Sequence, residues 1–127
     1  MTYIYNKSTT SKILGINPEE IQYISVGKEI LIAKLINGET IPIEIEDYLE
    51  YFYLARYERG KNIKFSKVGN HYAIYKSVRN GETKTYKVTK NKCDCKDFRL
   101  QKEAGLKNPK CKHIMAFQEL KLQRSIA

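Results

Sequence analysis

The chain has 127 residues, 42% of them hydrophobic, and a formal net charge of +9. This length favours one ordinary domain or two very small ones, and no apolar run is long enough to cross a membrane as a helix. Because no apolar stretch typical of a secretory signal opens the sequence, we expect an intracellular protein, cytoplasmic or nucleoid-associated, whose cysteines stay reduced.

The charge is divided unevenly along the chain. Residues 1–60 contain six Lys or Arg and nine Asp or Glu, whereas residues 61–127 contain seventeen Lys or Arg and five Asp or Glu. The two parts therefore carry formal charges of −3 and +12. A codon bias would spread lysine evenly, so this asymmetry indicates that the C-terminal half attracts polyanions.

Turn-forming residues separate the predicted elements of the N-terminal half. Residues 2–5 alternate and predict a short strand, and Asn17, followed by a proline and two acids, is typical of the start of a short helical turn. Two apolar runs, 29–36 and 40–45, flank Asn37-Gly38. Asn-Gly between two such runs is the strongest short-range signal for a β-hairpin, so we expect two antiparallel strands here.

A helix is predicted over residues 47–59. Asp47 and Glu50 resemble a capping box at its start, and Gly60 is expected to stop it. Its aromatic residues are too numerous for one narrow buried face, and its tyrosines are Tyr48, Tyr51, Tyr53 and Tyr57. Two interpretations remain. Either the helix packs on a sheet with tyrosine hydroxyls reaching water, or these tyrosines bind a protein partner or a second copy of the chain.

A second hairpin is predicted from residues 71–78 and 83–89, which flank Asn80-Gly81. Alternation makes one face of this hairpin apolar and gives the other face Lys and Thr. His71 stands at its start without a nearby partner in the sequence, and we interpret it as a surface or core residue rather than a metal ligand.

All three cysteines and one of the two histidines lie near the C-terminal end, in the order C-x-C, fifteen residues, C-x-H. They are Cys93, Cys95, Cys111 and His113. Three thiolates and one imidazole complete a tetrahedral shell for Zn²⁺ and leave no position for water, which favours a structural metal over a catalytic one. A disulfide framework is disfavoured because the cysteine count is odd, and a redox or incidental role remains the alternative.

The residues around the motif predict two further helices. Asp97 is expected to cap a short helix that Gly105 ends. The final helix is predicted over about residues 112–124, with an apolar face that covers the second hairpin. The residues expected on this face are Ile114, Met115, Phe117 and Leu120.

The order C-x-C, variable gap, C-x-H resembles the SWIM zinc finger, over about residues 75–122. Flanks that also fit are Tyr86-Lys87-Val88 before the first pair and Ile114-Met115-Ala116 after the histidine. The resemblance implies two strands before the first cysteine pair, a helix after the histidine, and zinc ligation by Cys93, Cys95, Cys111 and His113. Members of the family occur in mutator-type transposases, bacterial Swi/Snf-type ATPases and regulatory proteins, and are thought to bind DNA or other proteins.

Together these patterns predict an α+β fold of small antiparallel hairpins, each followed by a packing helix. We expect an N-terminal α+β region over residues 1–62 and a SWIM-like zinc-binding domain with a ββα unit over residues 63–127. The ββα unit is small, so zinc is expected to supply much of its stability.

The expected function is non-catalytic binding of nucleic acid, with DNA preferred over RNA, through the basic half. Lysine outnumbers arginine there, which favours recognition of the backbone or of shape over base reading. The candidate contacts are Lys90, Lys92, Lys96, Arg99, Lys102, Lys107, Lys110 and Lys112.

The alternative is a protein-interaction adapter that recruits a DNA-processing enzyme through the acidic, tyrosine-rich N-terminal half, which is also the candidate homodimer surface. No membrane association is expected. An enzyme is disfavoured because the sequence shows no Gly-rich phosphate loop, no Ser-His-Asp order and no open metal site.

Overall fold

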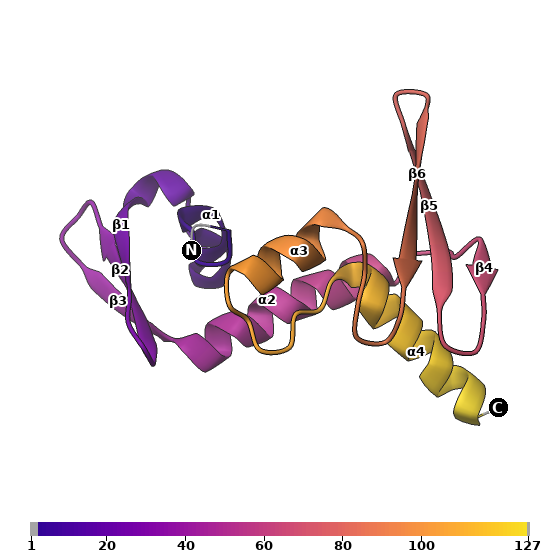
Figure 1. Ribbon diagram of the computed structural model, residues 1–127. Helices are drawn as coiled ribbons and strands as arrows, with labels where there is room; N and C mark the ends of the chain where they lie inside the picture. The colour runs from indigo at the N-terminus through magenta and orange to yellow at the C-terminus, as the bar shows by residue number, and fades with distance from the viewer. Residues whose placement is uncertain (1–2, 127) are drawn as a thin grey trace. The chain divides into compact units, whose positions relative to one another are not determined.

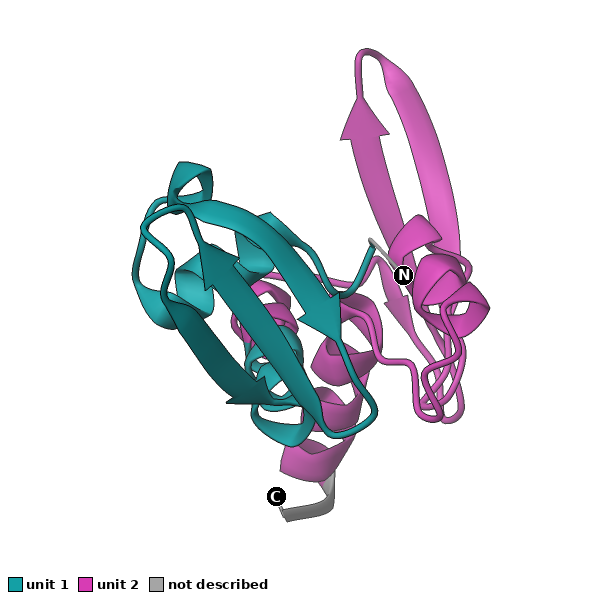
Figure 2. Cartoon of the chain, turned by 90° about the vertical axis from the view of Figure 1, so that its left-hand side faces the viewer, with its two compact units in different colours: residues 1–54 teal, residues 55–127 magenta. Residues whose placement is uncertain are grey.

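The computed structural model describes residues 3–126 of the chain (Figure 1). Contacts divide the chain into two compact units, Met1–Leu54 and Ala55–Ala127, drawn in different colours in Figure 2. The division falls inside helix α2 (Ile45–Gly60). Each unit contains one three-stranded antiparallel sheet together with helices, so the predicted α+β class is confirmed.

The first unit holds a β-meander. Its elements are α1 (Lys7–Leu14), the 3₁₀ turn η1 (Pro18–Glu20), β1 (Ile21–Val26), β2 (Ile30–Leu35), β3 (Thr40–Glu44) and the first part of α2. The sheet has the order β1-β2-β3, with Ile32 opposite Ser25 on one side and Pro42 on the other. The predicted hairpin around Asn37-Gly38 is therefore confirmed, and Asn17 begins η1 with a complete capping box.

Two elements of this unit were not predicted. Residue 2 of the expected strand over 2–5 lies outside the described residues, and residues 3–5 form a turn and bend instead. Helix α1 follows, with the Asn6 side chain accepting a hydrogen bond from the Thr9 amide at 2.8 Å. Its Ser- and Thr-rich sequence has weak helix propensity, so the capping residue is the only local sequence signal for this helix. Strand β1 was also missed, because it begins directly at the end of η1.

The core of the first unit lies between the sheet and its helices. Its fully or nearly fully buried apolar residues are Ile4, Ile21, Leu31, Ala33, Leu35, Ile43, Tyr48 and Phe52. The Tyr48 hydroxyl donates to the Ile4 carbonyl at 2.9 Å and accepts from the Asn6 amide at 3.2 Å. Tyr48 therefore holds the segment before α1 against α2.

Helix α2 begins at Ile45, directly after β3, so Asp47 lies in its first turn and does not cap it. The prediction that Asp47 and Glu50 form a capping box at the start of this helix is therefore wrong, because the strand and the helix meet without a loop. Gly60 does end the helix, but its main role is packing. A Cβ atom on Gly60 would lie 2.8 Å from the Lys112 carbonyl oxygen and 3.7 Å from the Ala116 Cβ.

The second unit contains the predicted hairpin and two helices. Its elements are the end of α2, β4 (Lys67–Val68), β5 (Ala73–Arg79), β6 (Glu82–Val88), α3 (Lys96–Glu103) and α4 (Lys112–Ile126). The sheet has the order β4-β5-β6. Asn80 and Gly81 have φ values of 51° and 78°, the two positive values that a type I′ hairpin turn needs. The turn end of the β5–β6 hairpin projects from the rest of this unit (Figure 1).

Helix α4 packs on one face of this sheet. Ile114 and Phe117 are fully buried against Ala73 and Val88, as predicted, and Phe65 packs edge-on against Phe117. Met115 and Leu120 were expected in the same core, but both are only half-buried and line a groove on another side of α4. Phe65 and Val68, from the segment before the hairpin, are half-buried and pack against this core.

Candidate metal centre

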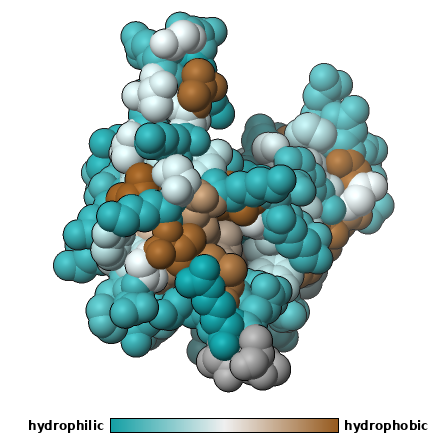
Figure 3. All heavy atoms as spheres, turned by 90° about the vertical axis from the view of Figure 1, so that its right-hand side faces the viewer, coloured by the Kyte–Doolittle hydropathy of each residue, from teal (hydrophilic) through white to brown (hydrophobic). Residues whose placement is uncertain are grey.

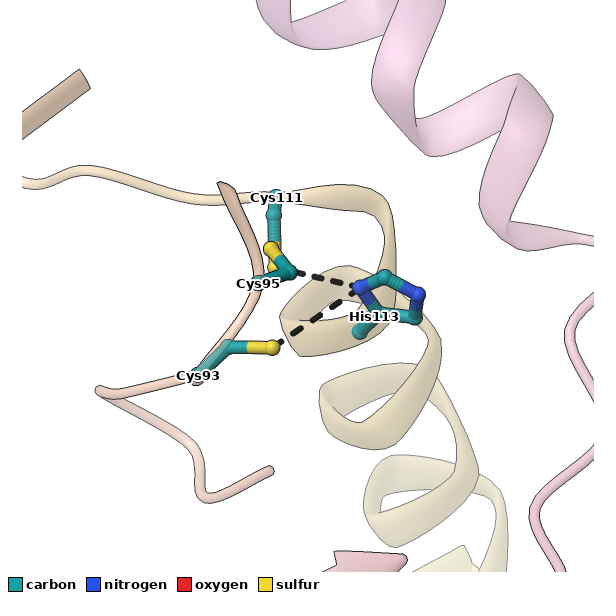
Figure 4. Close-up of side chains that lie close together, drawn as sticks. All are labelled: Cys93, Cys95, Cys111 and His113. Carbon is teal, nitrogen blue, oxygen red and sulfur yellow. Dashed lines mark hydrogen bonds between the residues drawn. The ribbon is translucent and has the colours of Figure 1, made fainter. Parts of the chain in front are cut away.

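The four predicted ligands meet in one buried cluster. All of them are at least 93% buried, and one donor atom from each lies within 4.8 Å of all the others. Figure 4 shows the three sulfur atoms and one imidazole nitrogen pointing toward a common centre. The cysteines form no disulfide. The fold thus forms a site that could bind a metal ion. Its residues come from the end of β6, the start of α3 and the start of α4.

The first cysteine pair is fixed by the end of β6. The Thr89 hydroxyl accepts hydrogen bonds from the Asn91 and Lys92 amides at 3.2 and 3.0 Å, which turns the chain back on itself. Cys93 consequently forms a bridge with Val88. The Asp94 carboxylate accepts from the Lys87 amide at 3.1 Å. The strand therefore presents Cys93 and Cys95 on one side, two residues apart.

Two of the three thiols sit at helix N-termini. Cys95 caps α3, and its sulfur accepts from the Phe98 amide at 3.4 Å. The Cys111 sulfur accepts from the Ile114 amide at 3.5 Å in the first turn of α4. The predicted cap, Asp97, is wrong because α3 begins two residues earlier than expected. Amide donors and the positive end of each helix favour the thiolate form that a metal requires.

His113 lies in the first turn of α4 and offers its Nδ1 atom to the cluster. Nδ1 is 3.7 Å from the sulfur of Cys93 and 3.7 Å from that of Cys111. The imidazole packs against the rings of both Tyr75 and Tyr86, with centroid distances of 4.7 and 5.5 Å. Its Nε2 is buried without a hydrogen-bond partner among the described residues. The two tyrosines therefore fix the ring plane, and Nδ1 is the nitrogen that faces the thiols.

Without a metal, the thiols share protons unequally. Hydrogen bonding to Cys111 and Cys95, together with burial, raises the pKa of Cys93 far above its usual range. The pKa of Cys95 is strongly lowered because its sulfur accepts from Cys111 and Cys93. Hydrogen bonding with Cys93 favours the Cys111 thiolate, but bonding with Cys95 and burial outweigh it and raise the pKa of Cys111 to about 12. The three thiols thus titrate as one coupled group, in which Cys95 ionises most readily.

A buried polar network ties the fifteen-residue gap between the cysteine pairs to α2. Arg56 donates from Nε and Nη2 to the two carboxylate oxygens of Asp97 at 2.9 and 2.8 Å. Gln101 is fully buried; its amide donates to Asp97 at 2.9 Å and to the Lys110 carbonyl at 2.8 Å, and it accepts from the Lys110 amide at 2.9 Å. Because Lys110 precedes Cys111, this network positions the second ligand pair.

The sequence did not identify this network. Asp97 and Gln101 stand one helical turn apart, which is the only local signal that they act together. Arg56 lies 41 residues before Asp97, and nothing in the local pattern links them.

The predicted nucleic-acid contacts lie on the surface of the same unit. Six of the eight are exposed, whereas Lys110 and Lys112 are half-buried. Arg99 lies 3.9 Å from Glu103, and the Lys90 carbonyl accepts from the side-chain amide of Gln118 at 2.8 Å. Exposed cations also follow the hairpin, where Lys76, Arg79, Lys84 and Lys87 are accompanied by a single acid, Glu82.

The four tyrosines of α2 occupy different environments. Tyr48 is fully buried and offers no surface to a partner, while Tyr51 and Tyr53 are half-buried. Tyr57 belongs to the second unit and is 36% exposed, with the Lys61 ammonium 5.3 Å from its ring centre. In the first unit, large exposed apolar side chains lie instead on the sheet, at Tyr23, Ile30 and Ile32.

Comparisons of the chain with protein-family models, with curated proteins and with solved structures found no match. Within residues 3–126, no helix combines the length and the hydropathy that a membrane span requires.

Proposed function

We propose that Cys93, Cys95, Cys111 and His113 hold a structural Zn²⁺ in a SWIM-type zinc finger. Zn–S bonds of about 2.3 Å and Zn–N bonds of about 2.0 Å give a tetrahedron whose S···N edges are about 3.5 Å. The separations of Nδ1 from the sulfur atoms of Cys93 and Cys111, 3.7 Å each, are close to this edge. Zinc in this shell would crosslink the end of β6 to the starts of α3 and α4, and it would replace the thiol protons with bonds that need no solvent.

The order of elements supports the SWIM resemblance. Two strands, β5 and β6, precede Cys93, and His113 opens the long helix α4. Helix α3 fills the gap between the ligand pairs. The proposal therefore rests on the ligand order and this topology together.

A comparison of two histidine variants tests the zinc proposal. His113→Ala should reduce the zinc content from one per chain and lower the melting temperature of the second unit. His71→Ala is the matched control because His71 is exposed and outside the cluster. Inductively coupled plasma mass spectrometry and circular dichroism melts measure both effects. Equal zinc content and melting in the two variants would sink the structural-zinc proposal.

The second part of the proposal is that the zinc-held unit binds nucleic acid, with DNA preferred. One observation carries it: residues 61–127 combine seventeen cations with five acids, and most of these cations are exposed. Clustered cations that neutralise phosphates release condensed counterions, which gives affinity with little dependence on sequence. Three groups of cations are available: the gap between the ligand pairs, the start of α4, and the projecting β5–β6 hairpin.

The hairpin adds a shape argument to the charge argument. A two-stranded β-ribbon fits the major groove of B-form DNA. The outer part of the hairpin carries Lys76, Arg79 and Lys84 together with Val78, whose side chain is 68% exposed. An apolar side chain at such a position suits contact with a thymine methyl group. These features favour duplex DNA over a single strand.

Fluorescence anisotropy against labelled duplex DNA, single-stranded DNA and duplex RNA, in a salt series, tests nucleic-acid binding. We expect duplex DNA to bind best, with an affinity that falls steeply as salt rises. No binding of any of the three at 50 mM salt or below would reduce the basic surface to a solubility feature.

The protein-adapter alternative keeps one supporting observation. Tyr23, Ile30 and Ile32 are 42–51% exposed on the sheet of the first unit. Exposed apolar groups of this kind mark interaction surfaces. A pull-down with Ile30→Ser/Ile32→Ser, beside Tyr51→Ser/Tyr53→Ser, distinguishes the sheet from α2 as the binding surface. Partners kept by both variants would count against the adapter function in this unit.

A further inference from the structure

A groove of about 580 Å³ opens on the second unit, between the segment after α2 and the outer side of α4. Figure 3 shows apolar side chains gathered in a hollow on this face, surrounded by hydrophilic ones. The apolar lining residues are Ile63, Phe65, Val68, Met115, Ala116 and Leu120, all of them half-buried. The size lies in the range of binding pockets, and an apolar lining with few charges at its edge is typical of them.

The rim of this groove is basic. Lys61, Lys64 and Arg124 stand at its edge and are exposed, whereas Glu119 is the single acid among the lining residues. Lys61 pairs with Glu58 at 3.2 Å, but Lys64 and Arg124 form no ion pair with other described residues. An occupant would therefore meet an apolar floor and two or more unpaired positive charges.

We propose that this groove binds an acidic amphipathic peptide segment of a protein partner. Apolar side chains of the segment would enter between Phe65, Met115 and Leu120, while its carboxylates would face Lys64 and Arg124. Helical segments dock in grooves in this way through residues at i, i+3 or i+4. Met115 suits such a floor because a thioether adapts to side chains of different shapes. The positive charge of the surrounding unit attracts an acidic segment and disfavours a basic one.

The walls of the groove are fixed by the fold. Gly60 lets α2 approach the first turns of α4, and Phe65 packs edge-on on Phe117 with ring centres 6.1 Å apart. Lys121 also donates from its ammonium to the Asn70 carbonyl at 2.5 Å. The floor is therefore preformed, which lowers the entropy that binding must overcome. This site differs from the cations of the gap and the hairpin, and it does not depend on nucleic-acid binding.

Peptide selection on the purified full chain tests the proposal. Random dodecapeptides displayed on phage are selected, and one enriched sequence is synthesised with a fluorescein label for anisotropy. We expect enriched peptides to combine acidic residues with two or more large apolar ones. Leu120→Asp should weaken binding of the labelled peptide at least tenfold, as should Lys64→Glu/Arg124→Glu. Lys76→Glu/Lys84→Glu makes the same change of charge on the hairpin. This control should weaken binding of the labelled peptide less than threefold.

Several results would overturn the proposal. They are the absence of enriched sequences, enrichment without an excess of acids, and equal weakening by the rim variant and the hairpin control. If the rim variant loses affinity for duplex DNA and keeps affinity for the peptide, the rim is a phosphate contact and the groove is not a peptide site. Circular dichroism melts of Leu120→Asp and the rim variant check folding, and backbone NMR shifts of the wild-type chain locate the peptide independently of any variant.

Discussion

Arg56 at the end of α2 donates two hydrogen bonds, of 2.9 and 2.8 Å, to Asp97 in α3, which lies 41 residues further along the sequence. The Arg56 and Asp97 side chains are only 10% and 26% exposed. The same carboxylate accepts from Gln101, which in turn holds both backbone groups of Lys110. An ion pair outside the cluster thus orients both helices from which Cys95 and Cys111 emerge.

Arg56→Ala is expected to destabilise the second unit. Removing the guanidinium leaves a partly buried carboxylate short of two donors, which costs about 2–3 kcal/mol. Urea unfolding followed by circular dichroism measures the loss. Arg59→Ala is the control, because Arg59 is exposed and donates from Nε to the Ala55 carbonyl at 3.3 Å. A loss no greater than that of the control would show that the ion pair contributes little.

Gly60→Ala is expected to disturb the contact between α2 and α4. A Cβ 2.8 Å from the Lys112 carbonyl oxygen cannot be accommodated unless one backbone shifts. Overpacking of this kind costs about 1–3 kcal/mol, although alanine favours the helix itself. Thermal melts of Gly60→Ala and of Glu58→Ala, an exposed position in the same turn, provide the comparison. A Gly60→Ala protein more stable than wild type would show that the helices can separate freely.

Zinc binding is expected to release protons. The pKa values of Cys93 and Cys111 are raised in the metal-free cluster, whereas that of Cys95 is lowered. At neutral pH, zinc must therefore displace about two protons, and affinity should fall as the pH falls because protons return to the sulfur atoms. Calorimetry in buffers of different ionisation enthalpy counts these protons. Release of none would mean that the thiols are already ionised before zinc binds.

Charge reversal locates the nucleic-acid surface. Lys76→Glu/Lys84→Glu on the hairpin and Lys96→Glu/Lys102→Glu in the gap change the net charge equally, and each should lower the salt slope of duplex DNA binding by about two. Lys7→Glu/Lys28→Glu makes the same change in the first unit, where the local charge is negative, and should leave the slope unaltered. Equal effects of all three pairs would mean that net charge, rather than a surface, controls binding.

The parts of the structure that the sequence predicted are those with local signals. Both hairpins follow from Asn-Gly turns between apolar runs, and the four ligands follow from two pairs spaced by two residues. In both cases a few neighbouring residues determine the backbone, so no distant contact had to be known.

The parts that were missed depend on distant contacts. The Ser- and Thr-rich helix α1 is stabilised by its cap and by packing that its own sequence does not announce. Asp97 has the composition of a cap but pairs with Arg56, and the capping role passes to Cys95, whose sulfur is also a candidate ligand. Met115 shares the apolar character of Ile114 and yet lines the groove together with Phe65 and Val68, which come from a segment far away in the sequence.

Among the tyrosines of α2, Tyr48 most clearly belongs to the core and not to an interface. Its hydroxyl bonds to the Ile4 carbonyl and the Asn6 amide, and its ring packs on Tyr5 with centroids 5.1 Å apart. Tyr48→Phe removes only the hydroxyl and leaves two backbone groups short of a partner, so we expect a loss of about 1–3 kcal/mol in the free energy of unfolding. Tyr51→Phe, at a half-buried position in the same helix, is the matched control and should change it by less than about 0.5 kcal/mol. Urea titrations of both variants measure the difference. A stability loss in Tyr51→Phe equal to that in Tyr48→Phe would show that the bonds to residues 4 and 6 do not hold the N-terminal segment in place.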